Sequence, residues 1–583
     1  MKLVVVPVVC VAIFLAAVAC DPSRIMAPTL RFSQQQAEEL SVWNDYTLVN
    51  GPAGSEYPGL NYVVEPFRPT SFRRPGAERW TIQGETYFGE EVADVIFEKV
   101  GSYDIDVDGD LYVVHCRYVR REIRSLSDDD REKYFSAVET VYKVSQDEGM
   151  SRYGEAYKNI TYFVTLHHRL AGARDCDHLH DGLGFLTQHA ALTLTFEKVL
   201  QLIDPSVSVP YWDYTIEARA VEVTGDIHSW RSSIVFSDDW FGPAYTENSN
   251  IVSSGRWAFT GVEASQEGNA FGLLRAPWNM NDIPYLTRSN TTYGFSLSDV
   301  PSCEDHYDVM QLLTWETFGL EVQYKAHGTV HAMTGGAFGE SDYKTFLEEK
   351  LRLESSIARD IGLESFATQK NLWRAEYMDC PSLSACPTSD CRCSCPALTN
   401  YFNSSKTILA SMSPIFYDDA NFQNIDDTDV SYDLLALLCN GIPGFAIPKI
   451  GDNLESASPL DPSFYPTHPT LDRLLHWRRI LKFTNTSWPP NKARSVPFEY
   501  EAYCHGHALH DLLPFQDIFD FPQDPNTTTY KNIHLKNHAY TNKNLWDLMD
   551  PTDAQNSPMP YIYDTFTWPH CQNAGYPLTL VDD

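Results

Sequence analysis

The sequence predicts a mainly α-helical protein with a small β-rich extension near its N-terminus. Residues 192–202 carry apolar side chains at helical spacing. Ser127 is followed by acidic residues, which is the pattern of a helix N-cap with a negatively charged first turn. Residues 87–114 instead alternate short apolar runs with Gly and Asp, and this alternation favours strands.

Length and charge limit the possible organisation and partners. A chain of 583 residues exceeds one typical domain, so we expect either several domains or one large domain with insertions. The chain has 44 basic and 78 acidic residues, a formal net charge of −34. Such a surface repels nucleic acid and anionic lipid, so neither is an expected partner.

Residues 1–19 have the features of a secretory signal peptide. A single Lys2 precedes an apolar run over residues 3–18, and Ala17-Val18-Ala19 fits a small-residue cleavage site. The run is short for a membrane span. A lipoprotein reading would use Cys20, but Ala17 stands where Leu is usual. We therefore expect a secreted, extracellular protein that is free of the membrane after signal removal.

The cysteines and glycosylation sequons agree with secretion. Five of the 13 cysteines crowd into residues 380–395 in a Pro/Ser-rich context, which predicts a loop held by disulfide bonds in an oxidising compartment. A zinc ribbon is the alternative, but the spacing lacks paired Cys-x-x-Cys units. Five Asn-x-Ser/Thr sequons predict a glycoprotein. They lie at Asn159, Asn290, Asn403, Asn485 and Asn526.

Two groups of histidines suggest a metal site. His180 and His189 flank Phe185, and imidazole is a good ligand for copper, zinc, iron and nickel. Far downstream, His327 and His331 are four residues apart and would share one face of a helix. A zinc protease would need Glu directly after the first histidine of this pair, where the chain has Gly328.

The surroundings of these histidines form two recognisable motifs. The first combines His180, Phe185, His189, Phe196-Glu197 and Pro210-Tyr211-Trp212-Asp213. The second combines His327, His331, Gly335-Gly336, Asp461-Pro462, Phe464, His468 and Asp472-Arg473. Together they resemble the type 3 copper family, which comprises tyrosinases, catechol oxidases and haemocyanin functional units. The resemblance covers roughly residues 115–565.

The resemblance implies a four-helix-bundle core that holds two copper ions with three histidines each. The family's first ligand lies on a helix upstream, and both His167 and His168 compete for that role. We favour His167, because residues 163–167 look more like the family's approach to this ligand. The implied ligands are His167, His180, His189, His327, His331 and His468. His178 lies eleven residues before His189 rather than the family's nine, so we expect it to be exposed or behind the ligands.

Further residues are candidates for the surroundings of the coppers or the substrate pocket: Phe185, Gly328, Phe464, Asp472 and Glu321. Asp472 is expected either to orient a ligand or to pair with Arg473. Glu321, like Glu316, lies upstream of the second motif and is a candidate to approach the site. Many relatives bond a Cys two residues before the second ligand to that ligand as a thioether. Here His178 holds that place, so we expect no thioether and expect a disulfide at Cys176.

Two interpretations fit a further cluster downstream, which consists of Cys504, His505, His507 and His510. One is a disulfide-bonded loop cysteine with exposed histidines, and the other is a weak accessory metal site. Near the end, Tyr561 and Tyr563 resemble the Tyr-x-Tyr that closes the core of the family.

We expect the chain to divide into a β-rich extension over residues 20–110 and a tyrosinase-like copper domain over residues 111–575. The family has a short connection where this chain has a cysteine-containing insertion over residues 337–460, with a helix expected over residues 344–359. This insertion could cover the active site, carry partner contacts, or decorate the surface away from the chemistry.

The resemblance implies a secreted binuclear copper oxidase that converts o-diphenols to o-quinones with dioxygen, and it leaves monophenols open as additional substrates. The alternative is an oxygen-binding protein of the haemocyanin type, which has the same six ligands and no turnover. Carriers usually join several such units, so a single copper core favours the enzyme. A copper-free relative is disfavoured because all six histidines are present.

Overall fold

The computed structural model describes residues 40–46, 56–244, 250–296, 300–339, 343–382, 392–413, 416, 428–441, 447–482, 487–488, 504–515 and 540–579. The predicted signal peptide, Cys386, Cys391, Asn485 and Asn526 lie outside these residues. Within them, no helix is both long enough and apolar enough to cross a membrane.

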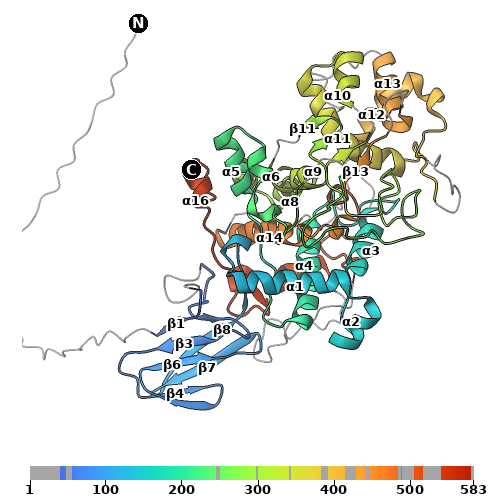
Figure 1. The fold of residues 1–583 in the computed structure, drawn as a ribbon. Coiled ribbons are helices and arrows are strands. Elements are labelled where there is room, and N and C mark those ends of the chain that lie inside the picture. Colours follow the sequence, from blue (N-terminus) through green and yellow to red (C-terminus); the bar gives the residue numbers. More distant parts are fainter. Residues whose placement is uncertain are drawn as a thin grey trace, which may run out of the picture. The chain divides into compact units, whose positions relative to one another are not determined.

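The predicted β-rich region is confirmed, and it forms two small sheets (Figure 1). One sheet has the order β1-β3-β6, formed by Ser41–Trp43, Thr70–Arg73 and Glu91–Val95. The other has the order β2-β8-β7-β4-β5, formed by Val63–Val64, Asp110–Cys116, Gly101–Val107, Arg79–Ile82 and Glu85–Phe88. Alternate side chains such as Trp80, Ile105 and Val114 are fully buried in an apolar cluster of their own.

The helical core is built around four segments that carry the histidines. These are α3 (Ile160–Ala171), α4 (Phe185–Ile203), the stretch from α8 (Trp315–Gln323) through a π-helical turn (Tyr324–Gly328) to α9 (Thr329–Gly335), and α14 (Phe464–Ile480). Helix α4 is almost entirely buried and packs against α14 (Figure 1). This is the mainly α-helical core that the sequence predicts.

The remaining helices surround this core. Helix α1 (Asp128–Lys143) begins as expected, because the Ser127 hydroxyl accepts a hydrogen bond from the Asp130 N–H at 3.2 Å. The others are α2 (Gln146–Tyr153), α5 (Thr215–Thr224), α6 (His228–Arg231), α7 (Cys303–Gln311), α15 (Asn542–Leu548) and α16 (Pro569–Asn573).

Short strand pairs connect distant parts of the chain. β9 (Tyr118–Arg120) pairs in parallel with β14 (Tyr561–Tyr563), which brings the Tyr-x-Tyr segment into the core. β12 (Ala337–Phe338) pairs with β13 (Lys449–Ile450), and so closes the two ends of the predicted insertion on each other. A hairpin of β10 (Thr291–Thr292) and β11 (Phe295–Ser296) lies in the preceding connection.

The insertion has its own helices, and its apolar core also includes residues of the preceding connection such as Trp278 and Phe295. It contains α10 (Tyr343–Thr345), a π-helical turn (Phe346–Lys350), α11 (Ser355–Arg374), α12 (Ser405–Met412) and α13 (Thr428–Asn440). The last three pack on one another (Figure 1). The single helix expected over residues 344–359 is wrong, because the chain leaves the helix at 351 and Arg352 adopts a left-handed conformation with φ 55°.

Disulfide bonds occur at four places in the described residues. Cys380–Cys393 and Cys395–Cys439 hold the insertion, which confirms the predicted disulfide-bonded loop at these cysteines. Cys176–Cys504 confirms the expected disulfide at Cys176, and Cys303–Cys571 joins α7 to α16. Cys116 is a buried free thiol.

Candidate metal centre

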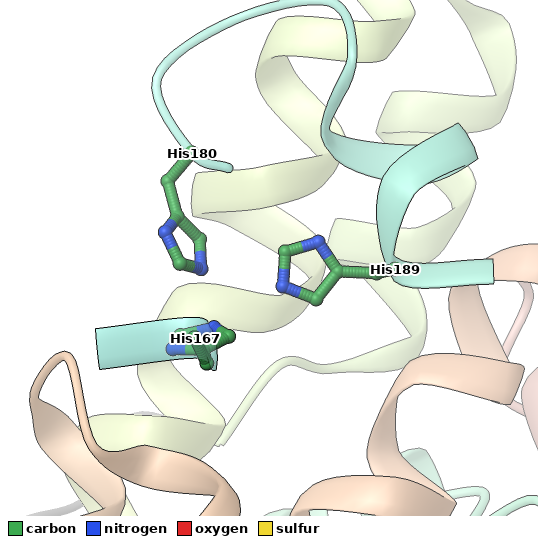
Figure 2. A group of neighbouring side chains, drawn as sticks. All are labelled: His167, His180 and His189. Atoms are coloured by element: carbon green, nitrogen blue, oxygen red, sulfur yellow. The ribbon is translucent and has the colours of Figure 1, made fainter. Parts of the chain in front are cut away.

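The first histidine set consists of His167, His180 and His189 (Figure 2). His167 lies on α3, His180 on the loop before α4, and His189 in the second turn of α4. Their ring centroids are 4.9–5.7 Å apart. One nitrogen from each ring lies within 4.8 Å of the others, which is close enough for all three to bind one metal ion.

The second histidine set consists of His327, His331 and His468. His327 lies in the π-helical turn, a feature that is frequent at functional sites. Its Nε2 atom is 2.7 Å from Nε2 of His331 and 3.2 Å from Nε2 of His468. The two sets adjoin, because the rings of His189 and His468 stack with centroids 4.5 Å apart.

All six imidazoles are oriented in the same way, with Nδ1 bonded to an oxygen. The acceptors are Ser456 O for His167, Asp177 Oδ1 for His180, Phe185 O for His189, Gln323 O for His327, Asn453 O for His331 and Phe464 O for His468, at 2.7–3.1 Å. A carbonyl or carboxylate oxygen only accepts, so Nδ1 carries the proton. Each Nε2 therefore presents a bare lone pair toward the centre of the cluster.

These lone pairs lack the partners that buried polar atoms normally have. Nε2 of His167 and of His189 is buried without a hydrogen bond among the described residues. In the second set, Nε2 lone pairs face one another at hydrogen-bond distance with no proton between them. A bound cation in each set would satisfy this arrangement. Three neutral imidazoles with open positions fit copper, so the residues fit a pair of such ions.

Burial favours the neutral form of five of the imidazoles, the form that metal binding requires. Desolvation, helped by the neighbouring His180, lowers the pKa of His167 to about 3. Desolvation also lowers the pKa of His331 to about 4 and holds the pKa of His189, His327 and His468 well below the usual value. At neutral pH these five imidazoles therefore have no proton on Nε2 that a metal must displace.

His180 differs from the other five because a carboxylate orients it. Asp177 Oδ1 accepts from Nδ1 of His180 at 3.1 Å, from the His180 N–H at 2.8 Å and from the Leu179 N–H at 3.1 Å. Burial by itself would raise the pKa of Asp177, but His180, Lys370 and Arg374 lower it well below its usual range. Asp177 is therefore an anion that shapes the loop and fixes the ring.

Two phenylalanines enclose the cluster, as the motifs suggest. The ring of Phe185 lies 4.4 Å from that of His189 and 5.1 Å from that of His327. The ring of Phe464 lies 4.2 Å from that of His468 and 5.3 Å from that of His167. Each phenylalanine thus contacts both sets. Apolar rings in these places limit the access of water and restrict the movement of the imidazoles.

The two competing histidines lie outside the cluster. His168 is buried, but its Nδ1 faces the Ser456 hydroxyl at 2.9 Å and its Nε2 faces Glu267 O at 3.2 Å. His178 Nδ1 faces His505 O at 2.9 Å and lies beside the Cys176–Cys504 disulfide. Neither ring has a nitrogen in either histidine set.

Both expectations for Asp472 are wrong. Its carboxylate accepts hydrogen bonds from Tyr561 at 2.7 Å and Tyr563 at 2.6 Å, and Arg120 lies 3.7 Å away. It neither orients a ligand nor pairs with Arg473, which faces Asp213 at 3.7 Å. Asp472 is close in sequence to His468, but its carboxylate is engaged by the two tyrosines of β14 and not by the histidine cluster.

The expected approach of Glu321 to the site is also wrong. Its side chain is exposed and interacts electrostatically with Lys325, which is exposed as well. Gly328 does border the second set, since it follows His327 directly. A Cβ at Gly328 would lie 3.3 Å from the Gln323 carbonyl oxygen, a tight contact, so a side chain fits there only after a small shift of this turn.

The cluster at residues 504–510 supports the loop of His180. Cys504 forms the disulfide with Cys176, and His505 and His510 are exposed as expected. His507 is instead fully buried, which corrects the expectation that it is exposed. Its Nε2 donates to Asp177 O at 2.7 Å, and its Nδ1 accepts from the Gly184 N–H at 3.3 Å. The ring therefore holds both ends of this loop and has no nitrogen left for a metal.

Sequence reasoning missed four residues that hold the ligands: Asp177, Asn453, Ser456 and His507. Asn453 and Ser456 act through backbone carbonyls, which leave no signal in the sequence. His507 acts across more than 300 residues. Only Asp177 had a local signal, because an Asp three residues before a loop histidine can accept from the backbone N–H groups that follow it.

Comparison with known proteins identifies the central region. Residues 157–346 match the family described as the common central domain of tyrosinase. This stretch includes five of the six clustered histidines, and His468 lies beyond its end.

Several curated relatives have low identity and partial coverage. A tyrosinase-like protein of Pinctada maxima is 24% identical over 241 residues, which is 38% of this chain and 45% of that protein. Tyrosinase-like protein 2 of Margaritifera margaritifera is 29% identical over 236 residues, 38% of this chain and 44% of that protein. The chain thus spans less than half the length of these two relatives. A tyrosinase of Streptomyces glaucescens is 23% identical over 37% of this chain and 72% of its own length.

Similar solved structures include a polyphenol oxidase variant from Thermothelomyces thermophila. It is 14% identical, with 77% of this chain and 88% of that chain covered and a TM-score of 0.32. A tyrosinase from Burkholderia thailandensis at low pH is also 14% identical, with coverage of 78% and 77% and a TM-score of 0.32.

Proposed function

The chain belongs to the type 3 copper family, and from that premise we propose that it is a binuclear copper oxidase that converts o-diphenols to o-quinones with dioxygen. The observation that carries the proposal is the convergence of six Nε2 lone pairs from two adjacent histidine sets. We assign one copper to His167, His180 and His189, and the other to His327, His331 and His468.

The copper pair, when bound, supplies the redox chemistry, in which two catechols give four electrons and four protons to one dioxygen and yield two quinones and two waters. The chain supplies the environment. Fixed Nδ1–H donors keep each imidazole in the tautomer that presents Nε2. Phe185 and Phe464 contact both sets and favour a flat aromatic substrate over water. His180 and His331 are only partly buried, so we propose that the phenol approaches from their side.

Metal content and turnover test the proposal together. After copper loading, elemental analysis should find two coppers per chain, and catechol should drive oxygen uptake with quinone formation. One copper per chain, or zinc retained against excess copper, would contradict the binuclear site. Two coppers with reversible oxygen binding and no catechol turnover would instead establish the haemocyanin-like alternative.

We also propose that the protein is secreted and glycosylated. The disulfide bonds support an oxidising compartment. Three sequon asparagines lie in the described residues, and Asn403 is exposed. Peptide mapping of the secreted protein without reduction should find Cys380 linked to Cys393 and Cys395 linked to Cys439. Free thiols throughout this segment would contradict an oxidised, extracellular protein.

A further inference from the structure

The insertion reaches the loop that carries His180. Near the C-terminal end of α11, the Lys370 ammonium lies 3.1 Å from Asp181 Oδ2 and 3.4 Å from Asp177 Oδ2. One turn later, the guanidinium of Arg374 lies 3.7 Å from Asp177 Oδ2. Two cations of the insertion therefore face two anions that flank one histidine of the first set.

Arg374 also fixes the end of α3, the helix of His167. Its guanidinium donates to Ala171 O at 2.7 Å and to Ala173 O at 3.0 Å. Because α3 ends at Ala171, the first bond satisfies a carbonyl group that a helix terminus leaves without a partner, and the second fixes the chain just beyond that end. Helix α11 is thus attached both to the loop of His180 and to the helix of His167.

The two carboxylate oxygens of Asp177 have different partners. Oδ1 accepts from Nδ1 and from the backbone N–H of His180, whereas Oδ2 faces Lys370 and Arg374. The side chain of Asp177 is only 3% exposed. A buried carboxylate is costly unless it is paired, so the cations of α11 are what allows an ionised Asp177 to remain behind His180.

Asp181 extends these contacts to the second set. It has a left-handed backbone with φ 61°, which is uncommon for a residue other than glycine. Its N–H donates to Gln323 Oε1 at 3.0 Å, and its Oδ1 accepts from the Tyr324 hydroxyl at 2.8 Å. Both partners adjoin the π-helical turn that carries His327. Lys370 therefore also holds a residue that bridges the two histidine sets.

We propose that Lys370 and Arg374 of the insertion are positioning residues for the first metal: they hold Asp177 and Asp181, and through Asp177 they present Nε2 of His180 to that metal. This inference rests on the proposed metal centre. It gives the insertion a role at the site, in place of a lid or a distant surface decoration. It also explains how a partly exposed loop ligand keeps its orientation without a thioether.

Titration with Cu²⁺ in two single-site backgrounds tests the proposal. In His468→Ala only the first set is complete, and in His189→Ala only the second. Lys370→Gln removes the charge and leaves a slightly shorter polar side chain, and it should weaken copper binding in the His468→Ala background by about 10- to 100-fold, the range typical of residues behind a metal ligand. In the His189→Ala background the same substitution should have a clearly smaller effect.

Matched variants control for general damage to the insertion. Lys350 is an exposed lysine of the same insertion, and Lys350→Gln should leave both affinities unchanged. Lys370→Arg preserves the charge and should retain most of the affinity of the first set. Arg374→Gln, like Lys370→Gln, should weaken copper binding by the first set. Thermal unfolding of each metal-free variant shows whether α11 is still folded.

The results separate this inference from the proposed function. If Lys370→Gln and Arg374→Gln fold and bind copper in the first set as tightly as their parent, the positioning role is wrong while the metal centre stands. Equal weakening of both sets would also overturn it, since that would reflect general destabilisation. Failure of the unsubstituted protein to bind two coppers would overturn the proposed function itself, and this inference with it.

Discussion

The two histidine sets have the same residues and the same tautomer, but the chain holds them by different means. In the second set, His327 and His468 each donate from Nδ1 to the carbonyl four residues earlier in their own helical stretch. In the first set only His189 does so. His180 lies on a loop, and Asp177 orients its ring. The carboxylate of Asp177 faces Lys370 of α11, and its backbone carbonyl accepts a hydrogen bond from His507.

The difference shows which part of the site local structure can build. An i to i−4 contact follows from helix geometry, so most of the second set is oriented once its helices form. The first set is complete only when residues near 177, 370 and 504 have come together. One feature is common to both sets, because the backbone at Asn453 and Ser456 orients His331 and His167. We therefore expect perturbations of tertiary structure to affect the first set before the second.

The largest expected effect follows removal of a ligand from either set. Alanine at His180, His189, His327, His331 or His468 should each lower catechol oxidation by more than about 100-fold, because even residues behind a ligand contribute 10- to 100-fold. His167→Ala should do the same, whereas His168→Ala should have a much smaller effect. Copper content and oxygen uptake are the measurements.

Two histidines near the sites serve as controls for these substitutions. His178→Ala and His510→Ala should retain two coppers and oxidase activity, because neither ring belongs to a histidine set. If His178→Ala lost copper while His180→Ala kept it, the assignment of the first set would be wrong.

The next effect should distinguish the two sets. Replacing both Cys176 and Cys504 by Ser removes the disulfide beside the loop of His180, and loss of a native disulfide typically costs about 2–5 kcal/mol. We expect a lower unfolding temperature and faster release of one copper to a chelator than of the other. Replacing both Cys380 and Cys393 by Ser should change copper release much less, because this disulfide joins residues only 13 apart in sequence within the insertion. Equal rates of release of both coppers from the variant without Cys176–Cys504 would contradict the proposed difference between the sets.

Replacement of Phe464 should have a smaller effect, and it should weaken copper retention by both sets equally. Phe464→Leu removes ring contacts with His468 and His167, one from each set. We expect a loss of stability below the roughly 3–5 kcal/mol of Phe→Ala changes in protein cores, with parallel release of both coppers. Phe135→Leu is a matched control, because this buried ring packs with Trp240 and Phe241 instead of the histidines. Release of only one copper from Phe464→Leu would show that the sets are independent.

Much of the fold and of the site was predictable from local patterns. The cap at Ser127, the helix over residues 192–202 and the strands near residues 87–114 follow from short-range propensities, and the structure has them. Spacing suggested His180 with His189 and His327 with His331, the family resemblance added His167 and His468, and the structure brings these six together in two sets. Asp472 was misjudged because its neighbour in the sequence is His468, whereas its hydrogen-bond partners come from β14. The contacts of Lys370 and His507 join segments that are nearly 200 and more than 300 residues away from the loop of His180, and no local pattern encodes them.

The smallest effect that we predict concerns which phenols react. Hydroxylation of a monophenol requires loss of the phenol proton near copper. The family resemblance implies a device for this step, because relatives that hydroxylate well have an Asn after the first ligand of the second set, which helps a Glu hold a water that acts as base. Gly328 occupies that place and has no side chain to orient a water. We therefore expect clear oxidation of o-diphenols and weak or lagging hydroxylation of monophenols.

The structure makes Gly328→Asn a feasible test of this expectation. Gly328 has ordinary helical φ and ψ, −53° and −38°, so a side chain brings no backbone strain. An added Cβ would lie 3.3 Å from the Gln323 carbonyl oxygen, which also accepts from Nδ1 of His327, so this part of the turn must shift by a few tenths of an ångström. The substitution should raise the ratio of monophenol to diphenol rates on matched substrates while copper content stays at two. Because Glu321 is exposed and beside Lys325, Glu321→Gln should leave that ratio unchanged. If the unsubstituted protein hydroxylates monophenols as fast as it oxidises diphenols, the residue after His327 does not determine the ratio of monophenol to diphenol rates.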